Sequence, residues 1–449
     1  MKKLTKNIFL IGLAVSTLTS CDNSYLDLEP KVSIDESAAL NTSKDIQVTL
    51  NGAYDGLSDV NVWGGGSQYI KELLVDDRDV VFGGTYTTLD EIWRKTIATT
   101  NGDITNLWLD SYNAINRVNN VMSAISKVDD ANRNRVEGEA RFIRGALYFD
   151  LVNLYGKFWG DGDNNTNLAV PLILTPTRGI TQDDYRTRAT VAQVYAQVID
   201  DLTKAEQLLS SQVDNYGFAS KNAAAAMLSR VYLAQGNYAL ARDAANRVIT
   251  SGVHALAPTF ADAFADGSNT EELIFRIIVT DQDGANDLNT FYGSTASNGR
   301  GDIRVQSKFL SLYSSEDSRG KFFERVNNLN FTLKFADRYG DLPIIRFAEM
   351  YLTRAECNFR LGTTVGALPI SDINKIRDRA GANLLTNLTL ADILKERRLE
   401  LAFEGGNYLD IKRTKQSVGA LTSNSNALTL PIPQREIDTN KSLVQNAGY

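Results

Sequence analysis

Residues 222–249 read NAAAAMLSRVYLAQGNYALARDAANRVI, and this stretch decides the fold class. Apolar residues recur at helical spacing before and after Gln235-Gly236-Asn237, and a Gly-containing break of this kind is typical of a turn. A seam of small residues on both sides allows close packing; it comprises Ala223 to Ala226, Ala241, Ala244 and Ala245. The stretch therefore predicts two helices packed as a hairpin.

The spacing of Leu233, Gly236 and Tyr238, followed by alanines, is that of a tetratricopeptide unit. Working outward, further helices are predicted at 41–57, 69–75, 108–125, 136–155 and 191–209, the last opened by a capping box of Thr190 and Gln193. A second pair is predicted at 345–361 and 370–379. No strict 34-residue repeat runs through the chain. The predicted fold is all-α, with irregular tetratricopeptide-like helix pairs at about 100–250 and 345–413 as the scaffold.

The segment from about 251 to 342 has a different composition. It is rich in Gly, Asp, Asn, Ser and aromatic residues, and it contains one strand-like run, Leu273 to Val279. We expect loops, short strands and short helices here, and a loop at 76–90. Long irregular segments on a rigid scaffold are common binding elements. This variable segment is therefore the predicted ligand-binding part.

The first twenty residues predict an export signal rather than structure. Lys2, Lys3 and Lys6 precede an apolar run, 8–15, that is too short to span a bilayer. Leu18-Thr19-Ser20-Cys21 matches a lipobox, which predicts cleavage before Cys21 and its lipidation; an ordinary signal with a chance cysteine is the alternative. Residues 21–40 are predicted to be an extended tether and 41–449 a single domain. Membrane contact is expected through the lipid anchor only.

Composition argues against several functions. The net charge is −7 and basic residues are not clustered, which argues against nucleic acid as a partner. His254 is the only histidine, so the usual zinc sites are not expected. Asp161-x-Asp163-x-Asn165 is similar to the start of a calcium loop, but Thr166 replaces the turn glycine and Leu172 the final glutamate. We expect a solvated loop there, and no metal or cofactor is predicted. Cys357 is expected to be a small buried residue.

Several charged residues gather on predicted helices. Glu396, Arg397, Arg398, Glu400 and Glu404 are predicted to lie on one helix, pairing across its turns and locking neighbouring helices together. Glu139, Arg141 and Arg144 are interpreted in the same way. A glycosidase needs two carboxyl groups at a set separation beside a cleft, which these patterns do not indicate. No catalytic residue is predicted.

A series of blocks resembles, in the same order, the SusD/RagB family of nutrient-binding lipoproteins. The blocks are YLDLEP at 25–30, EARFIRGALYF at 139–149, LYG at 154–156, VPL at 170–172, RFAEMYL at 346–352, INKIR at 373–377, ERRLELAFEG at 396–405, DIKR at 410–413 and LPIP at 430–433. They span nearly the whole chain after the lipobox. Two departures are Ala447, where the family tends to have Pro, and the polar insertion 161–167.

The resemblance implies a function. It implies a non-catalytic, cell-surface lipoprotein of the outer membrane that captures oligosaccharide or polysaccharide and delivers it to a TonB-dependent, SusC-like transporter barrel. The helical repeats are expected to face the barrel. Three alternatives are a peptide-binding lid of the same transporter type, a surface glycosidase, and a scaffold that binds only proteins.

A sugar offers apolar C–H faces and many hydroxyl groups, so its site calls for an exposed aromatic ring beside planar polar groups. Two clusters supply both. The predicted ligand-binding residues are Asp76, Asp77, Arg78, Phe82 and Tyr86 in the first loop, and Tyr292, Asn298 and Arg300 in the variable segment. As alternatives, the first three could only cap and pair at a helix end, and the aromatic residues could be core. Trp93 and Trp108 are predicted to be core; Trp63 is undecided between exposed and packed.

Overall fold

The computed structural model describes residues 40–449, apart from 180, 213, 266–270 and 283. The predicted signal segment, the predicted lipidation site Cys21 and nearly all of the predicted tether therefore lie outside the described residues. Within the part of the chain that is described, no helix has the length and apolar character needed to cross a bilayer.

Helices form about half of the described chain. They are α3 (Ser43–Ser58), α4 (Gly66–Val75), α5 (Thr87–Arg94), α6 (Gly102–Ser123), α7 (Asp130–Tyr155), α8 (Val191–Leu208), α9 (Lys221–Ala234), α10 (Tyr238–Ile249), α11 (Asp287–Tyr292), α12 (Ser307–Leu310), α13 (Phe347–Leu361), α14 (Pro369–Arg379), α15 (Leu390–Glu400), α16 (Gly406–Arg413) and α17 (Gln434–Thr439).

The strands are short and belong to two antiparallel sheets. They are β1 (Val80–Phe82), β2 (Leu273–Ile277), β3 (Ile303–Val305), β4 (Phe323–Val326), β5 (Leu329–Thr332) and β6 (Leu342–Arg346). One sheet has the order β1-β3-β5-β4, and the other pairs β2 with β6. The predicted fold, a tetratricopeptide-like helical scaffold with short strands in a variable part, is confirmed.

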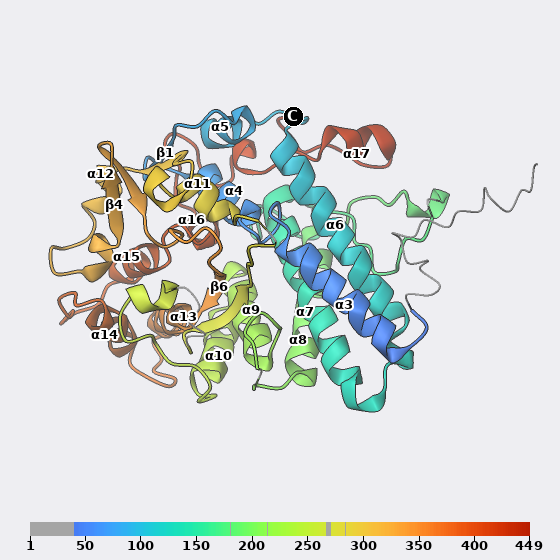
Figure 1. Ribbon diagram of the computed structural model, residues 1–449, viewed down its shortest axis with the longest axis horizontal. Coiled ribbons are helices and arrows are strands. Elements are labelled where there is room, and N and C mark those ends of the chain that lie inside the picture. Colours follow the sequence, from blue (N-terminus) through green and yellow to red (C-terminus); the bar gives the residue numbers. More distant parts are fainter. Residues whose placement is uncertain (1–39, 180, 213, 266–270, 283) are drawn as a thin grey trace, which may run out of the picture.

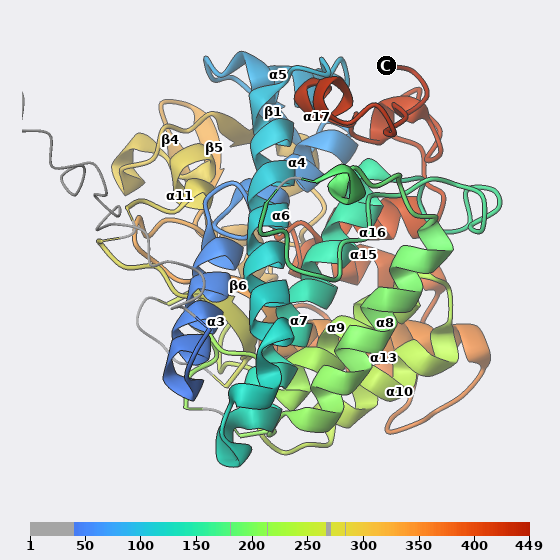
Figure 2. The same ribbon diagram turned by 90° about the vertical axis from the view of Figure 1, so that its right-hand side faces the viewer.

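The scaffold consists of helices packed side by side (Figures 1 and 2). The packed pairs include α3 with α6, α7 with α8, α9 with α10, and α13 with both α10 and α14. In the α9–α10 hairpin, Gly236 has φ +72°, a conformation that favours glycine. Asn237 caps α10 by accepting a hydrogen bond from the backbone N–H of Leu240, and the predicted alanine seam is buried. The stretch that suggested the fold thus forms the hairpin it predicts.

Helix α7 runs through the core and is buried on almost every side from Val136 to Tyr155. Its Arg144 donates two hydrogen bonds of 2.8 Å to Asp201 of α8 and one of 2.9 Å to Asn119 of α6. Asp201 is fully buried, so its charge requires this partner. The structural interpretation of this charged block is confirmed.

Two predicted boundaries are corrected. Ile345 lies in β6, and the helix begins at Phe347. The predicted loop at 76–90 contains β1 and the first residues of α5. Its strand forms because Val80, Val81 and Phe82 pair with β3, more than 200 residues away. A local pattern cannot show a partner at that separation.

The exposure of individual side chains tests the expectations for three tryptophans and for Cys357. Trp108 is core and Trp93 is half-buried, and Trp63 is packed, with its indole N–H donating to Asp150 at 2.8 Å. Cys357 is buried, as expected, and burial raises the pKa of its thiol to about 12. The thiol therefore stays protonated at neutral pH.

A buried network of charges joins the variable segment to the scaffold. It contains five cations and five carboxylates: Arg319, Lys334, Arg346, Arg377 and Arg379, with Glu272, Asp317, Glu396, Glu400 and Glu404. At its centre, Arg346 donates to Glu400 at 2.9 Å and to Glu272 at 2.7 Å. The ring of Phe264 covers the network, with its centroid 5.0 Å from the Arg346 guanidinium carbon. We call this set the Arg346–Glu400 network.

The network corrects one detail of the prediction. Glu396 and Glu400 do lock elements together, but their partners come from other elements and not from turns of the same helix. Glu404 lies beyond the end of α15, which stops at Glu400. The helical spacing of the charged residues continues from Glu400 to Glu404, so this spacing did not reveal that α15 ends at Glu400.

Replacing Glu400 by glutamine should destabilise the fold by about 3–5 kcal/mol, because three buried guanidinium groups would lose a counter-charge. Burial alone would raise the pKa of Glu400, but these guanidinium groups outweigh burial and hold the pKa well below its ordinary value. The stabilisation is therefore complete near neutral pH and is lost as the pH falls through the acid range. Urea unfolding at pH 7 measures the first effect. The second is measured by the narrowing of the difference between wild type and variant as the pH is lowered below 4.

Asp90→Asn is the matched control. It breaks the exposed pair of Asp90 with Arg94, whose side chains are 36% and 60% exposed, and should cost under about 1 kcal/mol. An equal loss of unfolding free energy in the two variants would show that the buried network contributes no more to stability than an exposed ion pair.

Candidate ligand-binding surface

The pairing of β1 with β3 brings the two predicted loops together. Val80 lies opposite Val305, and Phe82 opposite Ile303. Because the strands are antiparallel, the segment after β1 meets the segment before β3. The backbone N–H of Gly83 donates to the carbonyl of Asp302 at 2.7 Å, which extends the pairing beyond the strands.

Tyr86 and Arg300 meet at this end of the ladder. The Arg300 guanidinium carbon lies 4.8 Å from the centroid of the Tyr86 ring, and its Nε donates to Asp302 at 2.9 Å. Its Nη2 also donates to the Thr85 hydroxyl at 3.2 Å. The ring of Phe291 meets Tyr86 edge-on, with centroids 5.5 Å apart. Thr85, Tyr86, Phe291, Arg300 and Asp302 are named here the Tyr86–Arg300 surface.

This surface combines exposure with positioned side chains. Tyr86 is 46% exposed, whereas Phe291 beneath it is buried. The Arg300 side chain is 42% exposed, and Asp302, which holds it, is 7% exposed. A half-exposed aromatic ring beside a fixed guanidinium and carboxylate is suited to a ligand with both apolar faces and hydroxyl groups.

Close backbone approach in this region depends on Gly84. A Cβ at this position would lie 2.4 Å from Cγ of Asp302. That distance is far inside van der Waals contact, so any other residue would displace Asp302, the carboxylate that fixes Arg300. Gly84 thus belongs to the surface through its lack of a side chain.

Asp77 and Arg78 lie at the opposite end of the ladder. The Asp77 side chain is 44% exposed and faces Lys308, with Nζ 3.6 Å from the carboxylate. Arg78 is exposed and has φ +68°. Lys308 was not among the predicted site residues, because only the strand pairing places it beside Asp77. Short runs with Val or Ile at 80–82 and 303–305 were the one signal that could have suggested it.

Three predicted ligand residues are buried, which corrects their expected role. Phe82 is 5% exposed, Tyr292 is fully buried, and Asp76 is 9% exposed. Phe82 and Tyr292 present no face to an external ligand, because the sheet and α11 turn them into the core. Asn298 is exposed, at φ +59° before β3.

Asp76 shapes the turn that precedes β1. Its carboxylate accepts hydrogen bonds from the backbone N–H groups of Asp79 and Val80, at 2.9 and 3.0 Å, and from the Trp93 indole at 3.0 Å. Burial raises the pKa of Asp76 despite these hydrogen bonds. Asp76 therefore has the structural role that was given as the alternative for it, capping at a helix end, and not a role in ligand binding.

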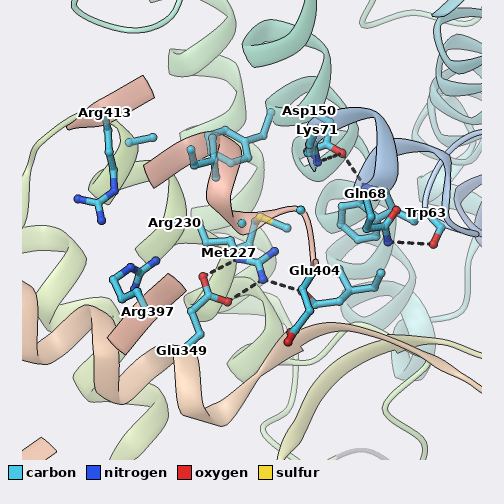
Figure 3. A pocket seen from close by; sticks show the side chains of 16 residues that line it. Trp63, Gln68, Lys71, Asp150, Met227, Arg230, Glu349, Arg397, Glu404 and Arg413 are labelled. Carbon is cyan, nitrogen blue, oxygen red and sulfur yellow. Dashed lines mark hydrogen bonds and ion pairs between the residues drawn. The ribbon is translucent and has the colours of Figure 1, made fainter. Parts of the chain in front are cut away.

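A separate cavity lies at the centre of the molecule (Figure 3). Its volume is about 50 Å³, and its charged lining is largely paired: Lys71 with Asp150 at 2.7 Å, and Arg230 with Glu349 at 2.6 Å. A water molecule needs about 10–15 Å³ of such volume, whereas ligand sites span about 300–1,000 Å³. This cavity suits a few waters and is too small for a sugar.

The polar loop at 161–167 is held by its own side chains. Asp163 accepts hydrogen bonds from the backbone and side-chain N–H groups of Asn165, at 2.9 and 3.1 Å. Among the described residues, no group of three or more His, Cys, Asp or Glu side chains is placed to hold a metal ion.

The stacked helix pairs form a frame for an irregular segment with an exposed aromatic ring. Two family models match the sequence: one described as starch-binding and associating with the outer membrane covers residues 24–233, and one of the SusD family covers 332–429. The chain belongs to the SusD/RagB family, as the sequence blocks predicted.

Individual relatives agree with this assignment. SusD-like protein P2 of Formosa agariphila is 26% identical, with all of both chains covered. The starch-binding protein SusD of Bacteroides thetaiotaomicron is 33% identical over 24% of this chain and 22% of its own. A crystal structure described as a putative sugar binding protein from Bacteroides vulgatus superposes with a TM-score of 0.83 at 27% identity, covering 92% of this chain and 99% of that one.

Glu72 of α4 provides a pH test of the packing beneath β1. It is buried and accepts a hydrogen bond from the Gly405 backbone N–H at 2.8 Å, and burial raises its pKa to about 8. A carboxyl whose pKa is higher in the folded than in the unfolded chain stabilises the fold at low pH, and this contribution is lost as the pH rises through 8. Glu72→Gln should therefore be more stable than the wild type at pH 9, by on the order of 4 kcal/mol, with a much smaller difference at pH 5.

Urea unfolding between pH 5 and pH 9 measures the difference. Glu271→Gln, at an exposed glutamate, is the control and should follow the wild type throughout. A Glu72→Gln curve parallel to that of the wild type would contradict the raised pKa.

Proposed function

We propose that this protein is a cell-surface, glycan-binding lipoprotein that captures oligosaccharide or polysaccharide and delivers it to a TonB-dependent outer-membrane transporter. Membership of the SusD/RagB family and the printed descriptions of starch- and sugar-binding relatives support a glycan ligand. The observation that carries the proposal is the exposed Tyr86 ring held between Arg300 and Phe291.

The chemistry of this surface favours a sugar over a peptide. The Tyr86 ring can stack on the C–H face of a pyranose, while Arg300 and Thr85 offer hydrogen bonds to its hydroxyl groups. A peptide that added a strand would need the free edge of β1. That strand has only three residues, and the Val80 N–H is already donated to Asp76.

We propose binding rather than catalysis at this surface. A glycosidase needs one carboxyl group with a raised pKa to act as the acid. Here Asp302 is paired with Arg300 at 2.9 Å, and Asp77 faces Lys308 at 3.6 Å. Each carboxylate is thus engaged by a cation, and the two lie at opposite ends of the strand ladder and not as a facing pair across a cleft.

The family resemblance and the lipobox support the proposed partner and location. In the proposal, the helical repeats face the transporter barrel and the Tyr86–Arg300 surface holds the glycan above it. Lipidation of Cys21 would keep the chain at the outer surface of the outer membrane.

Tyr86→Ala should weaken glycan binding about tenfold, close to 1.4 kcal/mol, because the stacking face is removed. Arg300→Gln should weaken it by a similar factor through the loss of charged hydrogen bonds. A glycan array followed by affinity electrophoresis of the best glycan measures both effects.

Phe218→Ala is the matched control. Phe218 is 40% exposed and packs edge-on against Tyr54 of α3, and it is not part of the Tyr86–Arg300 surface. It should leave retention unchanged. Undiminished retention in both Tyr86→Ala and Arg300→Gln would remove this surface as the ligand site, while reducing-end release from polysaccharide would establish an enzyme instead.

Cys21→Ser should abolish lipidation, because serine offers no sulfur for the diacylglycerol. Cells grown with a labelled fatty acid should yield a labelled wild-type protein and an unlabelled variant, and the variant should leave the membrane fraction. Retention of label in Cys21→Ser would overturn the predicted anchor, and Cys357→Ser, at the buried cysteine, controls for labelling elsewhere.

A further inference from the structure

A second concave surface lies among the helical repeats. It is a groove of about 660 Å³ formed by the start of α10, the end of α13, helices α15 and α16, and the residues that follow α16. Its volume lies within the range of about 300–1,000 Å³ typical of ligand sites. Unlike the central cavity, it is large enough for several sugar residues.

The lining of this groove carries a marked excess of positive charge. It contains five cations, Arg360, Lys395, Arg398, Arg413 and Lys415, and one carboxylate, Asp410. Glu356 and Asp79 pair with some of these cations from behind the surface. Even with both counted, cations outnumber carboxylates.

The arginines in the groove are already paired. Arg413 contacts Glu356 and Asp410 at 2.6 and 2.7 Å, and Arg398 is ion-paired with Asp79. Lys395 and Lys415 are different: both are exposed, and neither has an ion pair within 4.0 Å among the described residues. Asp392, three residues before Lys395 on α15, interacts with Lys395 electrostatically and does not line the groove. These two lysines are therefore the charges available to a ligand.

The remainder of the lining is apolar or neutral. Leu312, Leu390 and Leu394 form apolar wall, and Tyr238 lies at one end with the Arg360 guanidinium carbon 4.8 Å from its ring centroid. Amide and hydroxyl groups come from Asn407, Thr414 and Gln416. The groove thus offers apolar contact, neutral hydrogen bonds and two unpaired ammonium groups together.

We propose that this groove, named here the Lys395–Lys415 groove, binds a carboxylated oligosaccharide. A chain of uronic acids matches the lining, because each unit carries an apolar C–H face, hydroxyl groups and one negative charge. The carboxylates would pair with Lys395 and Lys415, and the C–H faces would lie on the leucines. The inference rests on the proposed function, since it names the class of glycan and adds a second site for it. This second site lies on the helical repeats, which the proposal turns toward the barrel, and is separate from the Tyr86–Arg300 surface.

Isothermal titration of the purified protein with hexagalacturonate at 50 mM NaCl tests the groove. Lys395→Gln/Lys415→Gln should weaken binding at least tenfold, because both free charges are removed while the stems and polar ends remain. Lys44→Gln/Lys221→Gln, which removes two exposed charges from α3 and α9, should bind like the wild type. Raising NaCl to 300 mM should weaken wild-type binding and have less effect on the groove variant.

Further probes separate this inference from the proposed function. Maltohexaose, a neutral glycan, should bind the wild type and the groove variant equally. If it binds in a Tyr86-dependent way while hexagalacturonate does not bind, the groove assignment fails and the proposed function stands.

Equal affinity of hexagalacturonate for the groove variant and its control would also overturn the assignment. So would displacement of hexagalacturonate by hexa-aspartate at equal concentration, since charge alone would then explain binding. Binding of neither sugar would overturn the groove assignment, while the glycan array decides the proposed function separately.

Discussion

The neutralisation of buried charge is the constraint on which the rest of the structure depends. Arg346 and Glu400 are fully buried, and a charge in that position is tolerated only with a partner in good geometry. Their partners come from the segment before β2, from the loop after α12, and from α14 and α15, so the network can form only when all these elements are in place. The variable segment, which has few regular elements to define its position, is fixed to the scaffold through these contacts. Strand β5 ends two residues before Lys334 of the network and pairs with β3, so this attachment also lies close to the sheet that carries the Tyr86–Arg300 surface.

The helical scaffold could be predicted from the sequence because its determinants are local. The α9–α10 hairpin is encoded by the turn at Gly236, the cap at Asn237 and the alanine seam, all within thirty residues. The capping box of Thr190 and Gln193 likewise places the start of α8. Charged blocks were correctly interpreted as structural, but their partners were not identified, since periodicity describes one helix and the pairs join different elements.

The candidate surface could be predicted only in part. Tyr86 and Arg300 were singled out by residue type, and the structure brings them together. Phe82 and Tyr292 have equally suitable side chains but are buried, because the strand pairing and the packing of α11 decide which aromatic residues face outward. Whether a given aromatic side chain is buried or exposed here depends on contacts between residues more than 200 positions apart. No local pattern carries that information.

The Arg346–Glu400 network has a consequence for biosynthesis. A chain is made from its N-terminus, and early segments fold as they become available. The α9–α10 hairpin can form at once, but Arg319 and Arg346 lack their main carboxylate partners until Glu396 to Glu404 have been synthesised. Closure of the core is thus deferred to the last tenth or so of the polypeptide. An unfinished chain is left open, which keeps it accessible to chaperones and proteases and makes completeness a condition for reaching the native state.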